Sequence, residues 1–179
     1  DAIARGEQSA AEPDGDQAPT GPIVVMTGDE PRKNTYGALA AIGAATAGSP
    51  EPRDVLVIGM AGQSTRVHHW SIHAAMRPGE ARTADRISED EMLRQLRGAS
   101  LVVVPSFDEG LSLPVIEAVR AGATVVASDI PAHRELIGRG SYLFDPRDLG
   151  AMESAIRRYA GRRRVRARQR QHLERHEHA

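Results

Sequence analysis

Residues 101–118 read LVVVPSFDEGLSLPVIEA and give the clearest structural pattern in the sequence. Its first four residues are apolar at every position, which is typical of a parallel strand buried on both faces of a sheet. A loop with two acids and a glycine follows. Pro114 then favours the first turn of a helix, where its missing N–H costs nothing. The stretch therefore predicts a strand, a polar loop and a helix in succession.

The same succession recurs along the chain. Other short apolar runs occupy residues 23–26, 55–58, 124–127 and 142–144. Stretches of helical character lie at 35–47, 64–76, 88–98, 112–121 and 147–160. The third of these has the pattern of a capping box, with Ser88 as N-cap and Glu91 three residues later. Alternating strands and helices predict a doubly wound parallel sheet, a Rossmann-like α/β fold whose ligands bind beyond the carboxyl ends of the strands.

The composition favours a single intracellular domain. A chain of 179 residues with 40% hydrophobic residues can bury one core. Because it contains no cysteine, disulfides, thiolate zinc sites and cysteine nucleophiles are excluded. Its apolar runs stay far below the roughly 20 residues that a membrane-spanning helix needs, and no signal-peptide pattern is visible at its start. We therefore expect a cytoplasmic protein.

The charge distribution divides the chain into three parts. The formal net charge is only −1, yet residues 1–20 are acidic and lack apolar periodicity, whereas residues 161–179 are rich in arginine. We expect residues 1–20 to be a disordered lead or linker, residues 21–160 to form the folded domain, and residues 161–179 to be a solvated, truncated terminal helix. A nucleic-acid-binding arm is the alternative for this basic tail. It lacks interleaved aromatics for stacking on bases, so we expect no nucleic-acid partner.

The loop and helix that follow the strand at 101–104 carry the strongest chemical signal. The N–H groups of Gly110 to Leu113 lie at the predicted helix start, where free donors and the helix dipole favour an anion such as phosphate. Glu109 and Glu117 lie in the loop and one turn into the helix, and carboxylates beside a phosphate site suit sugar hydroxyls. The alternative is that Glu109 caps the helix and Glu117 is a solvated surface acid. Spacing alone leaves both readings open.

Other polar residues give weaker signals. His69 and His73 are four residues apart on a predicted helix, but no acid lies near them in the sequence, so we expect no metal site. His133 follows a predicted strand, where it would either contact a ligand or cap a short helix; both interpretations stay open. Ser106 has no convincing His and Asp partners, so we expect no hydrolase triad.

Several short motifs occur in a fixed order along residues 99–148. They are Pro105-Ser106, Glu109-Gly110-Leu111-Ser112-Leu113-Pro114, Glu117-Ala118, Ala121-Gly122, Val125-Val126-Ala127-Ser128, Glu135 and Asp145-Pro146. In this order they resemble the signature region of the retaining glycosyltransferases of the GT-B fold, the large "group 1" family. Upstream, residues 31–34 resemble the element of that family that contacts the donor phosphates. Lys33 in that element is the only lysine of the chain, and the resemblance extends over residues 21–160.

The resemblance implies the C-terminal half of a GT-B enzyme, which binds the nucleotide-sugar donor. Such a half would bind a UDP- or GDP-sugar for retaining transfer of a hexose to a hydroxyl acceptor, with no metal and no other cofactor. Its expected partner is the N-terminal acceptor domain, which is absent from this chain, and without it we expect the isolated chain to be inactive. Peripheral membrane association through that missing half stays open. The alternatives are a non-catalytic nucleotide-sugar binding module and one half of a split enzyme.

The resemblance also implies roles for individual residues. Lys33 and Glu109 are the expected catalytic residues, and Lys33 would bind the diphosphate. Glu117 would bind the ribose. Glu109, together with the backbone of Gly110, Leu111, Ser112 and Leu113, would contact the donor sugar and phosphates. Arg32 would replace a basic residue that the family often has after its first strand. The chain also departs from the family pattern at Leu111 and Ser112, where Phe and Gly are usual.

Overall fold

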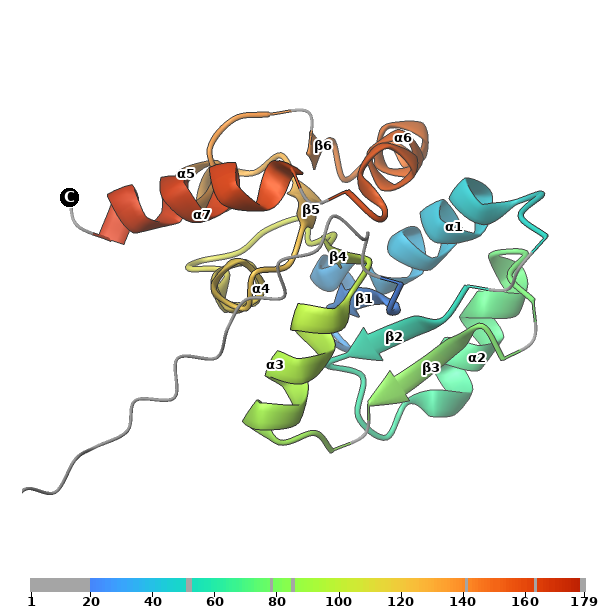
Figure 1. The fold of residues 1–179 in the computed structure, drawn as a ribbon. Coiled ribbons are helices and arrows are strands. Elements are labelled where there is room, and N and C mark those ends of the chain that lie inside the picture. Colours follow the sequence, from blue (N-terminus) through green and yellow to red (C-terminus); the bar gives the residue numbers. More distant parts are fainter. Residues whose placement is uncertain are drawn as a thin grey trace, which may run out of the picture.

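The computed structural model describes residues 20–50, 53–77, 79–84, 86–140, 142–162 and 164–177. The expected disordered lead falls, up to residue 19, outside the described residues. A parallel sheet of six strands in the order β3-β2-β1-β4-β5-β6 forms the centre of the molecule (Figure 1). Its strands are β1 (Ile23–Met26), β2 (Val55–Ile58), β3 (Ala81–Ala84), β4 (Leu101–Val104), β5 (Val125–Ser128) and β6 (Leu143–Phe144).

Helices cover both faces of the sheet (Figure 1). On one face α1 packs against α2 and α6, and on the other α4 packs against α3, α5 and α7. The elements are η1, a 3-10 turn (Pro31–Lys33), α1 (Thr35–Thr46), α2 (Ser64–His73), α3 (Glu89–Gly98), α4 (Leu113–Arg120), α5 (Pro131–Ile137), α6 (Leu149–Tyr159) and α7 (Arg164–Glu177). The expected doubly wound Rossmann-like α/β fold is therefore confirmed.

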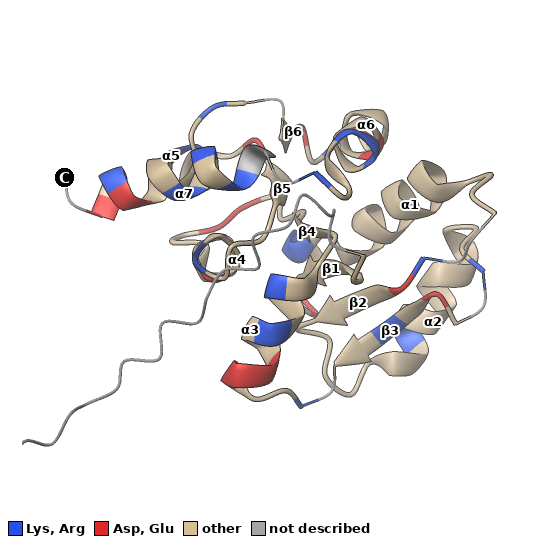
Figure 2. Cartoon of the chain, in the orientation of Figure 1, with Lys and Arg blue, Asp and Glu red and all other residues tan. Residues whose placement is uncertain are grey.

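The core is aliphatic and lies on both sides of the four central strands. Every residue of β1, β2, β4 and β5 is buried, as uninterrupted apolar runs predict for parallel strands covered on both faces. Helix α1 contains no charged residue, and in Figure 2 it is free of acidic and basic colour. A helix that is apolar on most sides needs several partners, and α1 has them in α2 and α6.

Strand β3 is the element that the apolar pattern does not reveal. Its sequence, Ala-Arg-Thr-Ala, has no apolar run because it lies at the sheet edge, and none of its residues is buried. Pairing with β2 supplies its backbone hydrogen bonds. Arg82 also forms an ion pair with Asp54, whose Oδ1 lies 2.9 Å from Nε. The neighbouring strand, rather than local propensity, therefore determines this edge.

Local signals place α3 correctly. The backbone N–H of Glu91 donates to Ser88 Oγ at 3.2 Å, so the expected N-cap is confirmed. The carboxylate of Glu91 accepts from Arg94 and Gln95 rather than from the Ser88 N–H, so among the described residues only the Ser88 half of the expected capping box forms. Among the described residues, no helix combines the length and apolar character needed to cross a membrane.

The basic terminal segment forms a helix, as expected, but one side of it is buried. Gln169 and Leu173 of α7 are 0% and 2% exposed. The side-chain amide of Gln169 donates to the C=O of Val125 at 2.7 Å and accepts from its N–H at 3.2 Å. The helix is therefore packed against α4 and α5 and reaches β5 through Gln169, in contrast to the solvated helix that its composition predicts.

The strand order reverses direction between β1 and β4. From β1 the chain proceeds outward to β2 and β3, and from β4 it proceeds the other way to β5 and β6. Because all six strands are parallel, the loops after β1 and β4 leave the same edge of the sheet side by side. This is the switch point at which doubly wound sheets bind ligands.

Candidate functional site

Lys33 lies in the connection that leaves β1. Its backbone C=O accepts a hydrogen bond from Thr27 Oγ1 at 3.1 Å, which fixes the turn η1 against the end of the strand. The aliphatic part of its side chain passes Gly28 so closely that a Cβ at Gly28 would lie 3.2 Å from Lys33 Cγ. Gly28 therefore leaves room for the lysine stem, which directs the ammonium group toward the loop after β4.

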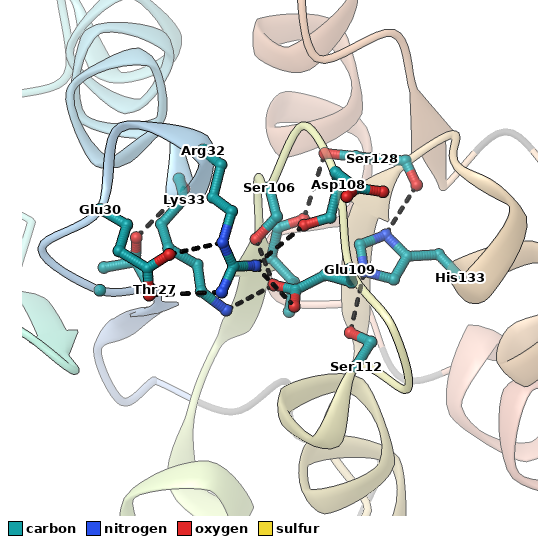
Figure 3. Close-up of polar contacts among 12 residues, drawn as sticks. Thr27, Glu30, Arg32, Lys33, Ser106, Asp108, Glu109, Ser112, Ser128 and His133 are labelled. Carbon is teal, nitrogen blue, oxygen red and sulfur yellow. Dashed lines mark hydrogen bonds and ion pairs between the residues drawn. The ribbon is translucent and has the colours of Figure 1, made fainter.

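The carboxylate of Glu109 receives that ammonium group (Figure 3). Lys33 Nζ lies 2.7 Å from Glu109 Oε1, and the side chains are only 15% and 7% exposed. Ser106 Oγ donates to the same oxygen at 2.6 Å, and Arg32 Nη1 approaches Oε2 at 3.4 Å. Burial raises the pKa of Glu109, but the hydrogen bonds from Lys33 and Ser106 and the charges of Lys33 and Arg32 outweigh it, so the pKa is lowered. Glu109 is therefore an anion at neutral pH.

Arg32 connects the two loops through its backbone and its side chain. Its C=O accepts from the N–H of Phe107 at 2.8 Å, and its Nη1 donates to the C=O of Asp108 at 3.3 Å. Glu30 accepts from Arg32 Nε at 2.6 Å and holds the guanidinium in place. The structure thus brings Arg32, Lys33 and Glu109 together from segments 76 residues or more apart in the sequence.

Asn34 extends this connection to a third segment. Its Nδ2 donates to the C=O of Pro105 and to the C=O of Pro146, each at 3.2 Å. Pro146 belongs to the segment between β6 and α6. The side chain of Asn34 therefore connects the loop after β4 with the segment after β6.

Helix α4 begins at the switch point without a side-chain cap. Ser112 is its N-cap, and within the described part of the chain the Ser112 side chain makes no capping hydrogen bond to the helix. The alternative that Glu109 caps α4 is therefore wrong, because its carboxylate binds Lys33 and Ser106 instead. Among the described residues, the N–H groups of residues 110–113 have no hydrogen-bond acceptor. Unpaired donors at a helix start favour an anion at this position.

Glu117 lies apart from the Lys33–Glu109 pair. It is partly buried on α4, and within the described part of the chain it makes no hydrogen bond or ion pair with Lys33 or Glu109. Burial raises its pKa, and the negative charge of Glu89 at the start of α3 adds to that effect. Glu117 is thus a partly desolvated carboxyl group rather than a fully solvated surface acid.

His133 has a role that sequence reasoning missed. It is 0% exposed; Nδ1 lies 2.8 Å from the C=O of Ser128 and Nε2 lies 2.9 Å from Ser112 Oγ. It does not cap α5, whose N-cap is Ile130. Burial lowers the pKa of His133, so the buried ring is neutral at pH 7. No local signal pairs two residues that are 21 positions apart.

The histidines of α2 lie elsewhere. The rings of His69 and His73 pack edge to face with their centroids 4.6 Å apart. Among the described residues, no group of three or more His, Asp or Glu side chains is arranged to hold a metal ion.

A six-stranded parallel sheet with charged loops at its switch point defines a Rossmann-like α/β domain. Residues 21–161 match the family described as "Glycosyl transferases group 1". The match spans most of the chain, and the chain therefore belongs to this family.

The similar curated proteins are mannosyltransferases. O-antigen chain mannosyltransferase B of Escherichia coli is 28% identical over 127 residues, which cover 71% of this chain and 33% of that protein. The MMP alpha-(1->4)-mannosyltransferase of Mycolicibacterium hassiacum is 32% identical over 79 residues, which cover 42% of this chain and 19% of that protein. The chain thus spans about a third of the Escherichia coli relative.

Solved structures share the fold. The alpha,alpha-trehalose-phosphate synthase (UDP-forming) of Burkholderia vietnamiensis superposes with a TM-score of 0.65 at 19% identity, covering 88% of this chain and 42% of that one. The catalytic domain of cholesterol-alpha-glucosyltransferase from Helicobacter pylori gives 0.66 at 16% identity, covering 89% of this chain and 99% of that one. These neighbours are GT-B glycosyltransferases, which places the domain within that architecture.

Proposed function

We propose that this domain binds the nucleotide-sugar donor of a retaining glycosyltransferase, a UDP- or GDP-sugar whose hexose is transferred to a hydroxyl acceptor. The observation that carries the proposal is the Lys33–Glu109 pair, 2.7 Å apart at the strand switch point. Glu109 lies in the loop after β4, which leads to the N–H groups at the start of α4 that have no acceptor among the described residues. Because the relatives described above are mannosyltransferases, a mannosyl donor is the first to test.

The diphosphate is assigned to Lys33 and the start of α4. Phosphate oxygens accept from the lysine ammonium and from the N–H groups of residues 110–113, where the helix dipole adds a partial positive charge. The low exposure of Lys33 limits the water that competes for the ammonium. An incoming diphosphate would share this ammonium with Glu109. Arg32 lies on the other oxygen of Glu109 and is positioned to add charge.

The donor sugar is assigned to Glu109. An ionised carboxylate only accepts hydrogen bonds, which matches the hydroxyl groups of a hexose. Its Oε1 already binds Lys33 and Ser106, whereas the contact of Oε2 within the described part of the chain is the long one to Arg32. Oε2 is therefore the oxygen that a sugar hydroxyl would reach. Held in this way, Glu109 orients the sugar and does not act as a nucleophile.

The proposed catalysis is electrostatic. As the bond between the sugar and the diphosphate breaks, negative charge grows on the departing diphosphate oxygen. Lys33 and the N–H groups at the start of α4 stabilise that charge, and they are held in position before the reaction. The acceptor oxygen would attack on the same face that the diphosphate leaves, and the departing diphosphate oxygen would take the hydroxyl proton, which retains the configuration without a required metal. Glu117 would bind the ribose hydroxyls.

Calorimetric titration tests this proposal. GDP, UDP, GDP-mannose and UDP-glucose are titrated into the wild-type chain, Lys33→Ala and Glu117→Ala. Arg94→Ala serves as a control because Arg94 is an exposed cation whose ion pair is confined to α3. We expect selective binding of one nucleotide family, lost in Lys33→Ala, weakened in Glu117→Ala and unchanged in Arg94→Ala. A folded wild-type chain that binds none of the four would contradict the proposal.

A further inference from the structure

Ser112 has an unusual backbone conformation for its residue type. Its φ and ψ are 50° and 60°, in the left-handed region that L-residues other than glycine rarely adopt. It is also only 3% exposed. Because Ser112 is the N-cap of α4, its conformation sets the direction in which the chain enters that helix.

A buried hydrogen-bond chain links Ser112 to the end of β5 (Figure 3). A backbone C=O can only accept, so His133 Nδ1 donates its proton to Ser128 O at 2.8 Å. In a neutral ring Nε2 then has no proton and accepts from the Ser112 hydroxyl at 2.9 Å. Burial lowers the pKa of His133 and so favours this neutral form. The three residues therefore form a directed chain from hydroxyl to imidazole to carbonyl.

The residues beside Ser112 provide no comparable anchor. Leu111 and Leu113 are 64% and 57% exposed. Gly110 is exposed, and a Cβ on it would meet nothing within 4 Å. Ser112 is thus the buried residue of the segment 110–113, and its side chain is hydrogen-bonded to His133 of α5.

We propose that Ser112 and His133 are positioning residues, which hold the left-handed turn at residue 112 and thereby aim the N–H groups of residues 110–113 at the diphosphate of the donor. This inference rests on the proposed function. It assigns His133 no contact with the substrate. Its effect passes through Ser112, and its other hydrogen bond is to Ser128 at the buried end of β5.

Two substitutions at residue 112 separate the conformation from the hydroxyl. Ser112→Gly and Ser112→Ala both remove the hydroxyl, but only glycine adopts a positive φ without strain. We expect Ser112→Gly to keep the Kd for GDP or UDP within about twofold of the wild-type value. We expect Ser112→Ala to raise the Kd by about three- to tenfold, because the turn relaxes when nothing holds it.

A substitution at His133 completes the test. His133→Asn retains an amide N–H for Ser128 but is too short to accept from Ser112. In the otherwise wild-type chain, we expect His133→Asn to raise the Kd for GDP or UDP by about three- to tenfold. In the chain that already carries Ser112→Gly, we expect it to change that Kd by less than about twofold. A purely structural role for His133 would weaken both backgrounds alike. Circular dichroism and thermal unfolding confirm that each variant is folded at the titration temperature.

The outcomes distinguish the inference from the proposed function. If His133→Asn does not fold, the comparison of Ser112→Gly with Ser112→Ala still tests whether the Ser112 hydroxyl, which bonds His133, holds the left-handed turn. Equal affinities of these two variants, or equal effects of His133→Asn in both backgrounds, would overturn the positioning roles while the wild-type chain still binds nucleotide. A folded wild-type chain that binds neither GDP nor UDP would overturn the proposed function, and the inference with it.

Discussion

The ammonium of Lys33 lies 2.7 Å from the carboxylate of Glu109 and joins the connections that leave β1 and β4. These two residues are 76 positions apart in the sequence. Both side chains are largely buried, so each desolvated charge depends on the other. Removal of either partner would therefore leave the other as an uncompensated, largely buried charge.

Removal of Lys33 should destabilise the fold. Lys33→Ala leaves the buried carboxylate with Ser106 and the longer Arg32 contact, so we expect a loss of about 1–3 kcal/mol in the free energy of unfolding. Urea unfolding near neutral pH measures it. The double variant Lys33→Ala/Glu109→Gln should recover part of the loss, because no uncompensated charge remains. Strict additivity of the two single effects would show that the pair is not coupled.

Glu109 should make the stability of the chain sensitive to acid. Its folded pKa is lowered, so its contribution is fully present above the ordinary value of 4.5 and is lost as the pH falls through the folded pKa. Wild type should therefore lose stability relative to Glu109→Gln as the pH falls below 4.5. Thermal unfolding of both chains across this range measures the difference. Parallel profiles would rule out this linkage.

Glu117 should have the opposite pH dependence. Its folded pKa is raised, so the protonated form is favoured, and that contribution is lost as the pH rises from 4.5 through the folded pKa. Glu117→Gln should then unfold at a higher temperature than wild type near neutral pH and at the same temperature in acid. Solvent screens this partly exposed group, so we expect a gain of less than about 1 kcal/mol. A variant that is less stable at neutral pH would contradict the prediction.

Gln169 should anchor α7 through its amide rather than through its size. Gln169→Leu leaves the N–H and C=O of Val125 without their partner, and we expect a loss of about 1–3 kcal/mol. Chemical denaturation measures it. The matched control is Gln171→Leu on the exposed side of the same helix, which should change stability by less than about 0.5 kcal/mol. Equal effects of the two substitutions would show that the paired amide is unimportant.

The sequence predicts the central strands because both faces of the sheet bury them. The apolar runs at 23–26, 55–58 and 101–104 coincide with β1, β2 and β4, and the run at 124–127 begins one residue before β5. Edge strand β3 could not be predicted from an apolar run, because pairing with β2 rather than its own residues determines its conformation. The same holds for α7, whose arginine-rich composition hides the buried contacts of Gln169 and Leu173.

The candidate site was predictable only in part. The resemblance to group 1 glycosyltransferases singled out Lys33 and Glu109, and the fold brings them together. Their roles in donor binding stay predictions. The contribution of Ser106 and the contact between His133 and Ser112 could not be read from the sequence, because they depend on how separate loops meet in three dimensions.

The amide of Gln169 occupies the place that a neighbouring strand would take. Ala127 donates to the C=O of Tyr142 on the β6 side of β5, and Val125 lies two residues earlier, on the same side. Strand β6 spans only Leu143–Phe144, so that edge would otherwise present open hydrogen-bonding groups near Val125. Such edges are templates for association with other chains. Because the Gln169 side chain pairs with Val125 at this edge, we expect α7 to reduce self-association of the domain as well as to stabilise it.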